Sequence, residues 1–326
     1  MLSDARKAIR RGTAPGILLV LLTAVISGVA TFVNTLALRA NPAWNSDPFV
    51  TVRNVAVALM LVPLAALAWR AAPARLTRRD WGKLVTIGLV GGAIPFLLFF
   101  RGIQVATGQG GAAAATFGYR TLFVMATVLG VVVLRERFHI RLALAAGLLL
   151  AGSALLLTLT GAVWTDGTAY VLAATAMWAG EYALSKHALR TLAPGTVALG
   201  RMGFGGAFLL AYIGLTGQAG SIPAMGAAWP WILLSSVLLV GFVTTWYAGL
   251  KHVDLSVASA ALVLAFPITW VLTVASTPAA WGLPQAAGAV TVAFGVALAI
   301  GMASLRQTWD YLACIVRLRL RRAAVR

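Results

Sequence analysis

Four ionisable side chains interrupt long apolar stretches of this sequence: Arg53, Arg120, Glu181 and Arg201. A charge at the centre of a bilayer costs roughly 3 kcal/mol on insertion scales, so a charge inside a membrane span is a candidate for function. A guanidinium group can hold a carboxylate through two parallel hydrogen bonds. A buried carboxyl group can bind and release a proton. These residue types therefore indicate anion binding or proton transfer, provided that their stretches cross a membrane.

The composition indicates that they do. Hydrophobic residues make up 60% of the chain and charged residues 10%, whereas roughly 25% of residues are charged in a typical soluble protein. The apolar residues form blocks of about twenty, the length that crosses a hydrocarbon core roughly 30 Å thick. We predict an all-α polytopic membrane protein with ten transmembrane helices, at 15–37, 49–69, 82–103, 111–134, 141–161, 167–187, 196–217, 229–250, 255–276 and 284–304. The first block is longer than the core of a signal peptide and is followed by nine more, so we keep it as a span.

The distribution of charge predicts the topology. The formal net charge of +18 is also typical of nucleic-acid-binding proteins, but Lys and Arg gather in the N-terminal arm, the even-numbered loops and the tail. The odd-numbered loops carry only Arg39 and Arg101. Because cytoplasmic loops are enriched in Lys and Arg, we expect both termini to be cytoplasmic in a plasma or inner membrane. The charge then marks topology, and no nucleic-acid partner is expected.

The sequence also contains an internal repeat. The stretch "FRGIQVATGQGGAAAATFGYRTLF" at 100–123 aligns with "YAGLKHVDLSVASAALVLAFPITW" at 247–270, and Arg53 pairs with Arg201 at an offset one residue larger. We divide the chain into a basic arm, two five-helix repeats and a basic tail, at 1–14, 15–161, 167–304 and 305–326. Five spans per repeat is an odd number, so the second repeat is expected to be inverted in the membrane. Inverted repeats are typical of secondary transporters, whose substrate sites lie near the midplane between the halves.

The chain resembles the EamA family of the drug/metabolite transporter superfamily over about residues 15–304. The resemblance rests on the two five-span halves, the arginine early in the second span of each half, "LRER" at 134–137 and "VASAALVLAFPITWVLTV" at 257–274. It implies the export of amino acids, other small metabolites or toxic compounds. Two departures stand out. Arg120 lies where the repeat partner has Pro267, and the second half lacks an acidic counterpart of Glu136.

Depth separates the three arginines. Arg53 and Arg201 lie close enough to the ends of their spans for a guanidinium group to extend to a membrane surface, and a role in helix packing is the simpler interpretation of both. Arg120 lies in the middle of the fourth span, too far from either surface. It is expected either to pair with a neighbouring helix or to face a central cavity, where it would bind the carboxylate of a substrate. We favour the second interpretation.

Glu181 shares one helix face with Trp178 and Tyr182, because the three lie at i, i+3 and i+4. It is expected either to pair with Arg201 or to carry a proton that couples to transport. The remaining candidates are aromatic or proline. Tyr119, Phe266 and Trp270 would line a substrate cavity with Trp178 and Tyr182, although packing is the common role of such rings, and Pro95 and Pro267 are expected to kink their helices.

The leading hypothesis is therefore a secondary transporter that exports a small organic metabolite such as an amino acid by alternating access, with proton coupling left open. A flippase for a lipid or lipid-linked sugar would share the fold and stays as the alternative. An intramembrane enzyme fits less well, since the spans bring no second acid to Glu181, and no nucleotide-binding loop is present. The scattered histidines, His139, His187 and His252, predict no metal site, and no cofactor is expected. The oligomeric state stays open.

The predicted topology can be tested by labelling single cysteines in a Cys314→Ser background with an impermeant thiol reagent. Cysteines at Gly108 and Ser221 should be labelled from outside intact cells, because the odd-numbered loops are predicted to be external. Cysteines at Arg75 and Arg190 should react only after the cells are opened. Labelling at Arg75 in intact cells would reverse the assignment.

Overall fold

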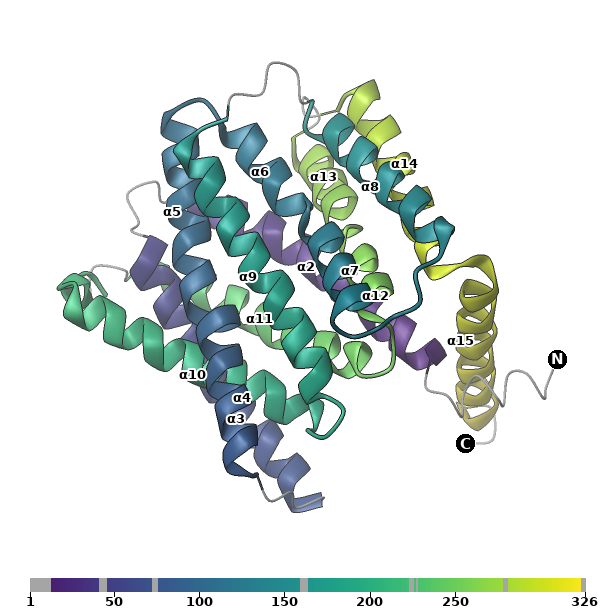
Figure 1. The fold of residues 1–326 in the computed structure, drawn as a ribbon, viewed down its shortest axis with the longest axis horizontal. Helices are drawn as coiled ribbons and strands as arrows, with labels where there is room; N and C mark the ends of the chain where they lie inside the picture. The colour runs from purple at the N-terminus through teal and green to yellow at the C-terminus, as the bar shows by residue number, and fades with distance from the viewer. Residues whose placement is uncertain are drawn as a thin grey trace.

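The computed structural model describes residues 13–40, 46–71, 76–158, 164–222, 226, 228–277 and 281–323, and every regular element within these ranges is a helix (Figure 1). The helices of the first half are α2 (Thr13–Ala40), α3 (Ser46–Ala71), α4 (Arg78–Ile87), α5 (Ile94–Gly108), α6 (Ala112–Arg120), α7 (Leu122–Val132) and α8 (Ile140–Leu156). Those of the second are α9 (Asp166–Ala188), α10 (Pro194–Leu215), α11 (Trp229–Leu250), α12 (Leu255–Leu262), α13 (Ala265–Ser276) and α14 (Leu283–Ile300), and α15 (Met302–Ala323) forms the tail. A π-helix, η1 (Gly88–Ala93), joins α4 to α5, and a 3₁₀-helix, η2 (Gln218–Ser221), follows α10.

Each of the ten predicted spans overlaps a helix or helical segments in series, and residues 159–161 of the fifth span lie outside the described residues. Within the described ranges, eight of these segments are long and apolar enough to cross a membrane. The other two are α8, with 17 residues, and α9, whose 23 residues include Asp166, Glu181 and Lys186. The structure therefore describes a multi-pass membrane protein.

The helix contacts fall into pairs that exchange when the two halves are swapped. Helix α2 packs against α11 and against α12 and α13, whereas α9 makes the equivalent contacts with α5 and with α6 and α7. The pairs α3–α10 and α8–α14 join equivalent helices of the two halves, whereas α7–α12 joins the second part of the fourth span to the first part of the ninth. Figure 1 shows α9 between α5 and α7, and α8 beside α14 at one edge of the bundle. The described helices therefore make partly matching contacts in the two halves.

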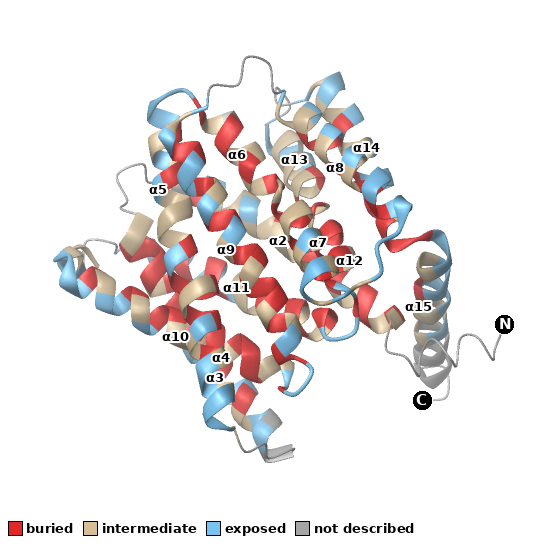
Figure 2. Ribbon diagram, viewed as in Figure 1, coloured by how far each residue is buried: buried red, intermediate tan, exposed pale blue. Residues whose placement is uncertain are grey.

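Glycines bring η1 and α10 into close contact. A Cβ atom on Gly205 would lie 2.7 Å from the Cα atom of Gly92, and one on Gly88 would lie 2.4 Å from the Cβ atom of Phe204. Small residues at such spacing allow membrane helices to approach closely, since packing rather than the hydrophobic effect drives their association. The buried residues lie mainly on the inward faces of the helices, and exposed residues on the outer faces (Figure 2).

Three spans are interrupted near their middle. In the ninth span α12 ends at Leu262 and α13 begins at Ala265. Pro267 has no N–H group to donate to the carbonyl of Val263. This carbonyl accepts a hydrogen bond from the N–H group of Phe266 instead (3.2 Å). In the third span, the π-helix η1 ends two residues before Pro95. The fourth span is interrupted at Thr121, whose hydroxyl group donates to the carbonyl of Gly118 (2.7 Å). The sequence analysis did not anticipate this third interruption.

The contact between η1 and α10 predicts that Gly205→Ala will destabilise the protein. The added methyl group would overlap the backbone of Gly92, and overpacking of this kind costs roughly 1–3 kcal/mol. The matched control is Gly203→Ala, because a Cβ atom on Gly203 of the same helix would meet nothing within 4 Å. Melting temperatures in detergent should fall for the first variant and stay unchanged for the second. Equal melting temperatures for both variants would contradict the close contact.

Candidate functional site

A cavity lies between the two halves, where the interrupted spans meet. Its volume is about 60 Å³, room for a few water molecules. Helices α2, α6, α7, α9, α11, α12 and α13 all contribute to its wall. The lining residues are Ser27, Thr31, Tyr119, Arg120, Leu122, Phe123, Tyr182, Phe242, Ser259, Leu262, Val263, Ala265 and Phe266.

Arg120 brings the charge into this cavity. It is the last residue of α6, directly before the interruption at Thr121, and 9% of its surface is exposed. Its Cζ atom lies 3.9 Å from the centre of the Phe266 ring, a distance typical of a cation–π contact. Its Nε and Nη1 atoms have no hydrogen-bond partner, and no acidic group pairs with it in the described part of the chain. The guanidinium group is therefore buried without a compensating anion.

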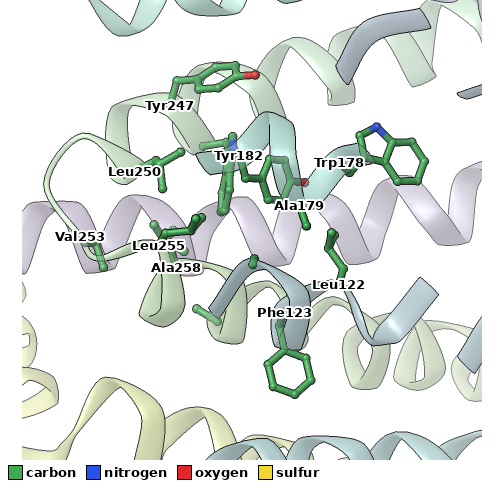
Figure 3. Close-up of a cluster of buried hydrophobic side chains, with 14 of the residues drawn as sticks. Leu122, Phe123, Trp178, Ala179, Tyr182, Tyr247, Leu250, Val253, Leu255 and Ala258 are labelled. Carbon is green, nitrogen blue, oxygen red and sulfur yellow. The ribbon is translucent and has the colours of Figure 1, made fainter. Parts of the chain in front are cut away.

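Aromatic side chains surround Arg120. The Tyr119 ring contacts the rings of Phe266, Trp178 and Phe99 at centroid separations of 6.3, 5.5 and 5.1 Å. Edge-to-face contacts of this kind hold rings in fixed orientations. Trp178 and Tyr182 of α9 and Leu122 and Phe123 of α7 belong to the same buried cluster (Figure 3). The wall around the guanidinium group is thus largely apolar, with hydroxyl groups at Ser27, Thr31 and Ser259.

Glu181 and Arg201 form a separate buried network beside the cavity. The Oε1 atom of Glu181 accepts hydrogen bonds from Ser185 Oγ (2.5 Å) and Tyr247 Oη (2.8 Å). Its Oε2 atom lies 3.6 Å from Arg201 Nη1. Neither residue lines the cavity, and both are buried. The pairing that the sequence allowed is therefore present, and it links α9 to α10 and α11.

Pro95 leaves a backbone carbonyl free to accept hydrogen bonds from the Nε and Nη2 atoms of Arg201. Proline has no N–H group, so the carbonyl of Gly91, four residues earlier, loses its usual α-helical donor. This carbonyl accepts hydrogen bonds from Arg201 Nε and Nη2 (3.3 and 3.1 Å) and from Trp178 Nε1 (3.1 Å). A Cβ atom on Gly91 would lie 2.3 Å from Glu181 Cγ, so only glycine allows this approach. Trp178 thus has a structural hydrogen bond in addition to its contact with Tyr119.

Arg53 and Arg201 do not extend to a membrane surface, although both lie close enough in sequence to do so. Each has only 4% of its surface exposed. The guanidinium group of Arg53 donates to its neighbour Asn54 Oδ1 (3.4 and 3.3 Å) and lies over the Phe96 ring at 5.3 Å. Asn54 in turn donates to the carbonyl of Gly92 (3.2 Å). Both arginines therefore bind near the π-helix η1.

The cavity brings together part of the set of residues expected from the sequence. Arg120, Tyr119, Tyr182 and Phe266 line it, whereas Trp178 lies behind Tyr119 and Trp270 is half-buried on α13 outside the cavity wall. The sequence analysis missed the lining residues of α2 and α11, which are Ser27, Thr31 and Phe242. For α2 a signal was present, because Thr23, Ser27 and Thr31 lie four residues apart and share one helix face. Phe242 is one of many apolar residues of its span, so the sequence does not single it out.

Comparison with known proteins establishes the family. The model of the EamA-like transporter family matches the chain twice, at residues 14–158 and 166–301. None of the curated proteins matches. A solved structure described only as "Crystal structure of protein" has a TM-score of 0.71, is 18% identical, and covers 90% of this chain and 98% of its own, which shows a shared fold. The two matches confirm the resemblance seen in the sequence, and the chain belongs to the EamA-like transporter family.

Proposed function

We propose that the protein is a secondary transporter that moves a small carboxylate-bearing metabolite, such as an amino acid, across the cell membrane by alternating access. The observation that carries this proposal is the unpaired guanidinium group of Arg120 in the cavity between the halves. A buried arginine with no anion is costly unless water or a ligand compensates it. A carboxylate bound bidentately would do so.

The surroundings of Arg120 fit an organic anion. Tyr119, Phe123 and Phe266 offer aromatic and apolar surface, and Ser27 and Thr31 offer hydroxyl groups. Small-molecule sites commonly combine apolar walls with a few polar groups that fix orientation. The repeat partner of Arg120 is the uncharged Pro267, so a two-fold architecture does not itself require a cation here. This asymmetry supports a role in substrate binding.

The size of the cavity implies movement. Binding sites for small molecules have volumes of roughly 300–1,000 Å³, and this cavity has about 60 Å³. The walls must therefore separate before a substrate can enter. The interruptions at Thr121 and between Leu262 and Ala265 divide two of the lining spans into short helices that can tilt separately. The exchangeable helix contacts of the two halves support alternating access, because swapping the two conformations would open the opposite side.

For Glu181 we favour the structural role over proton coupling. Its carboxylate lies against Ser185, Tyr247 and Arg201 and outside the cavity wall. A buried acid that balances a buried arginine is strongly needed for stability once the arginine is present.

The first test replaces Arg120 in purified protein and measures ligand-induced thermal stabilisation with a panel of amino acids and their amides. Wild type should be stabilised by at least one acid and not by its amide, since the amide has no carboxylate for the guanidinium group. Arg120→Gln should weaken binding at least tenfold, because a hydrogen bond to a charged group contributes about 1.5–3 kcal/mol. Arg120→Lys should bind with intermediate affinity, because it keeps the charge and loses the bidentate geometry.

The matched control is Arg101→Gln, which removes an exposed arginine from α5 and should leave binding unchanged. Transport in proteoliposomes should follow the same order as binding. Normal transport of the same substrate by a well-folded Arg120→Gln protein would rule out the proposed role of Arg120. Stabilisation by a phospholipid that is lost in Arg120→Gln, with no stabilisation by any amino acid, would favour the flippase.

The second test separates the two roles of Glu181. Glu181→Gln leaves the charge of Arg201 unpaired, and breaking a buried ion pair costs roughly 3–5 kcal/mol. If the role is structural, the melting temperature should fall in Glu181→Gln and recover partly in the double variant Glu181→Gln/Arg201→Gln. If Glu181 carries the coupling proton, a stable Glu181→Gln protein should lose pH-driven transport and keep substrate exchange.

A further inference from the structure

A second, larger pocket lies at the end of the bundle that carries most of the basic loops. Its volume is about 390 Å³. The α7–α8 connection, the end of α9 and the start of α12 meet there. The lining residues are Leu134, Arg135, Glu136, Arg137, His139, Arg141, Leu142, Lys186, Arg190, Asp254, Ser256 and Val257.

Two charged residues form the framework of this pocket. The carboxylate of Glu136 accepts hydrogen bonds from the backbone N–H groups of Leu255 (2.5 Å) and Ser256 (3.0 Å) and from the Ser256 hydroxyl group. The amino group of Lys186 donates to the carbonyls of Leu250 and Val253 (2.6 and 2.7 Å). Glu136 therefore holds the start of α12, and Lys186 holds the turn before it. Both charged groups therefore already have hydrogen-bond partners within the protein.

The other charges of the pocket are mostly positive and unpaired. Arg135, Arg137, Arg141 and Arg190 are exposed, and none makes a hydrogen bond or ion pair with another residue that the structure describes. The one acid of the lining besides Glu136 is Asp254. Four guanidinium groups, from the α7–α8 connection, the start of α8 and the end of α9, thus line one hollow that contains a single uncommitted carboxylate.

This arrangement favours a phosphate group. A phosphate presents several charged oxygen atoms in different directions, and each guanidinium group can hold two of them. A carboxylate offers two oxygen atoms in one plane and would satisfy fewer of the arginines. Basic pockets between helices at the ends of membrane spans are also typical sites for anionic lipid headgroups.

The neighbouring surface favours a lipid as the source of the phosphate. Val132, Val133, Phe138 and Ile140 flank the lining residues in sequence and are among the exposed large hydrophobic residues. Acyl chains could lie along these side chains while the headgroup enters the pocket. The basic loops alone would be explained by topology, but topology does not require that arginines of different loops converge on a hollow.

We propose that this pocket binds a phosphate-bearing anion, with an anionic phospholipid headgroup as the favoured ligand. Arg137 and Arg190 hold the phosphate from opposite connections, and Glu136 and Lys186 keep the walls in place. The site is distinct from the cavity around Arg120, because the two have no lining residue in common. It would stabilise the contact between the two halves at this end of the bundle.

The test titrates purified full-length protein in detergent with short-chain phosphatidylglycerol or phosphatidylcholine and measures binding by native mass spectrometry. Wild type should prefer phosphatidylglycerol. Arg137→Gln/Arg190→Gln should weaken that binding roughly 30-fold, since each basic residue near a bilayer surface contributes about a fivefold factor. The matched control, Arg78→Gln/Arg79→Gln, removes two exposed arginines of α4 and should bind as wild type does.

A competition with inorganic phosphate identifies the source of the ligand. Displacement of phosphatidylglycerol by millimolar phosphate would support a site for the phosphate group itself, open to lipids and soluble anions. Specific lipid binding that phosphate does not displace would support a lipid site. Equal affinity for the two lipids together with no phosphate binding would overturn the proposal. An equal loss of binding in both double variants would also overturn it, because the effect would then be one of net charge.

Discussion

The carbonyl of Gly91 is the point on which the central helices depend. Within a bilayer every backbone polar group must find a partner inside the protein. Pro95 removes the usual donor of this carbonyl, and Arg201 and Trp178 replace it from α10 and α9. Because Arg201 is buried, it requires Glu181, and Glu181 in turn fits only against a glycine at position 91. The N–H group that Pro95 lacks thus connects the π-helix η1, the Glu181–Arg201 ion pair and Trp178 through the carbonyl of Gly91.

This unit also separates the roles of two buried arginines, Arg201 and Arg120. The charge of Arg201 is balanced by Glu181 and by three hydrogen bonds, so it can hold helices together. The charge of Arg120 has an aromatic ring at 3.9 Å and no anion in the described part of the structure. Proteins tolerate such an imbalance where a ligand or water can complete the site. Arg201 therefore serves helix packing, whereas Arg120 is suited to ligand binding.

The sequence predicted the features that depend on length, depth and period. Span length located the helices, and the depth of Arg120 placed it inside the protein together with its neighbours Tyr119 and Phe266. Helical spacing placed Trp178, Glu181 and Tyr182 on a common buried face. Both prolines lie at or directly beside an interruption of their span. These inferences needed only local sequence.

The features that the sequence did not reveal depend on packing between distant helices. The burial of Arg53 and Arg201 results from η1 and α5, which bring carbonyl groups and the Phe96 ring to these side chains. The interruption at Thr121 could not be predicted from a proline, because none lies nearby. It is accompanied instead by a hydrogen bond from the Thr121 hydroxyl group to the carbonyl of Gly118. Ser27 and Thr31 share a helix face with Thr23, but only the contacts of α2 with α11, α12 and α13 show that this face turns toward the cavity. Phe242 is one of many apolar residues of α11, so its place in the cavity also follows from packing.

Because Arg120 pairs with no acidic group among the described residues, it gives the cavity one net positive charge at mid-depth of the fourth span. A bound monoanion would cancel that charge, whereas a zwitterion would leave it in place. A charge that crosses the whole membrane changes energy by about 2.3 kcal/mol per 100 mV. The membrane voltage would therefore change the rate at which the protein without substrate switches between its inward-open and outward-open conformations. It would have little effect on the same switch when a monoanion is bound. One unpaired side chain would make the transport rate depend on voltage without any coupled ion.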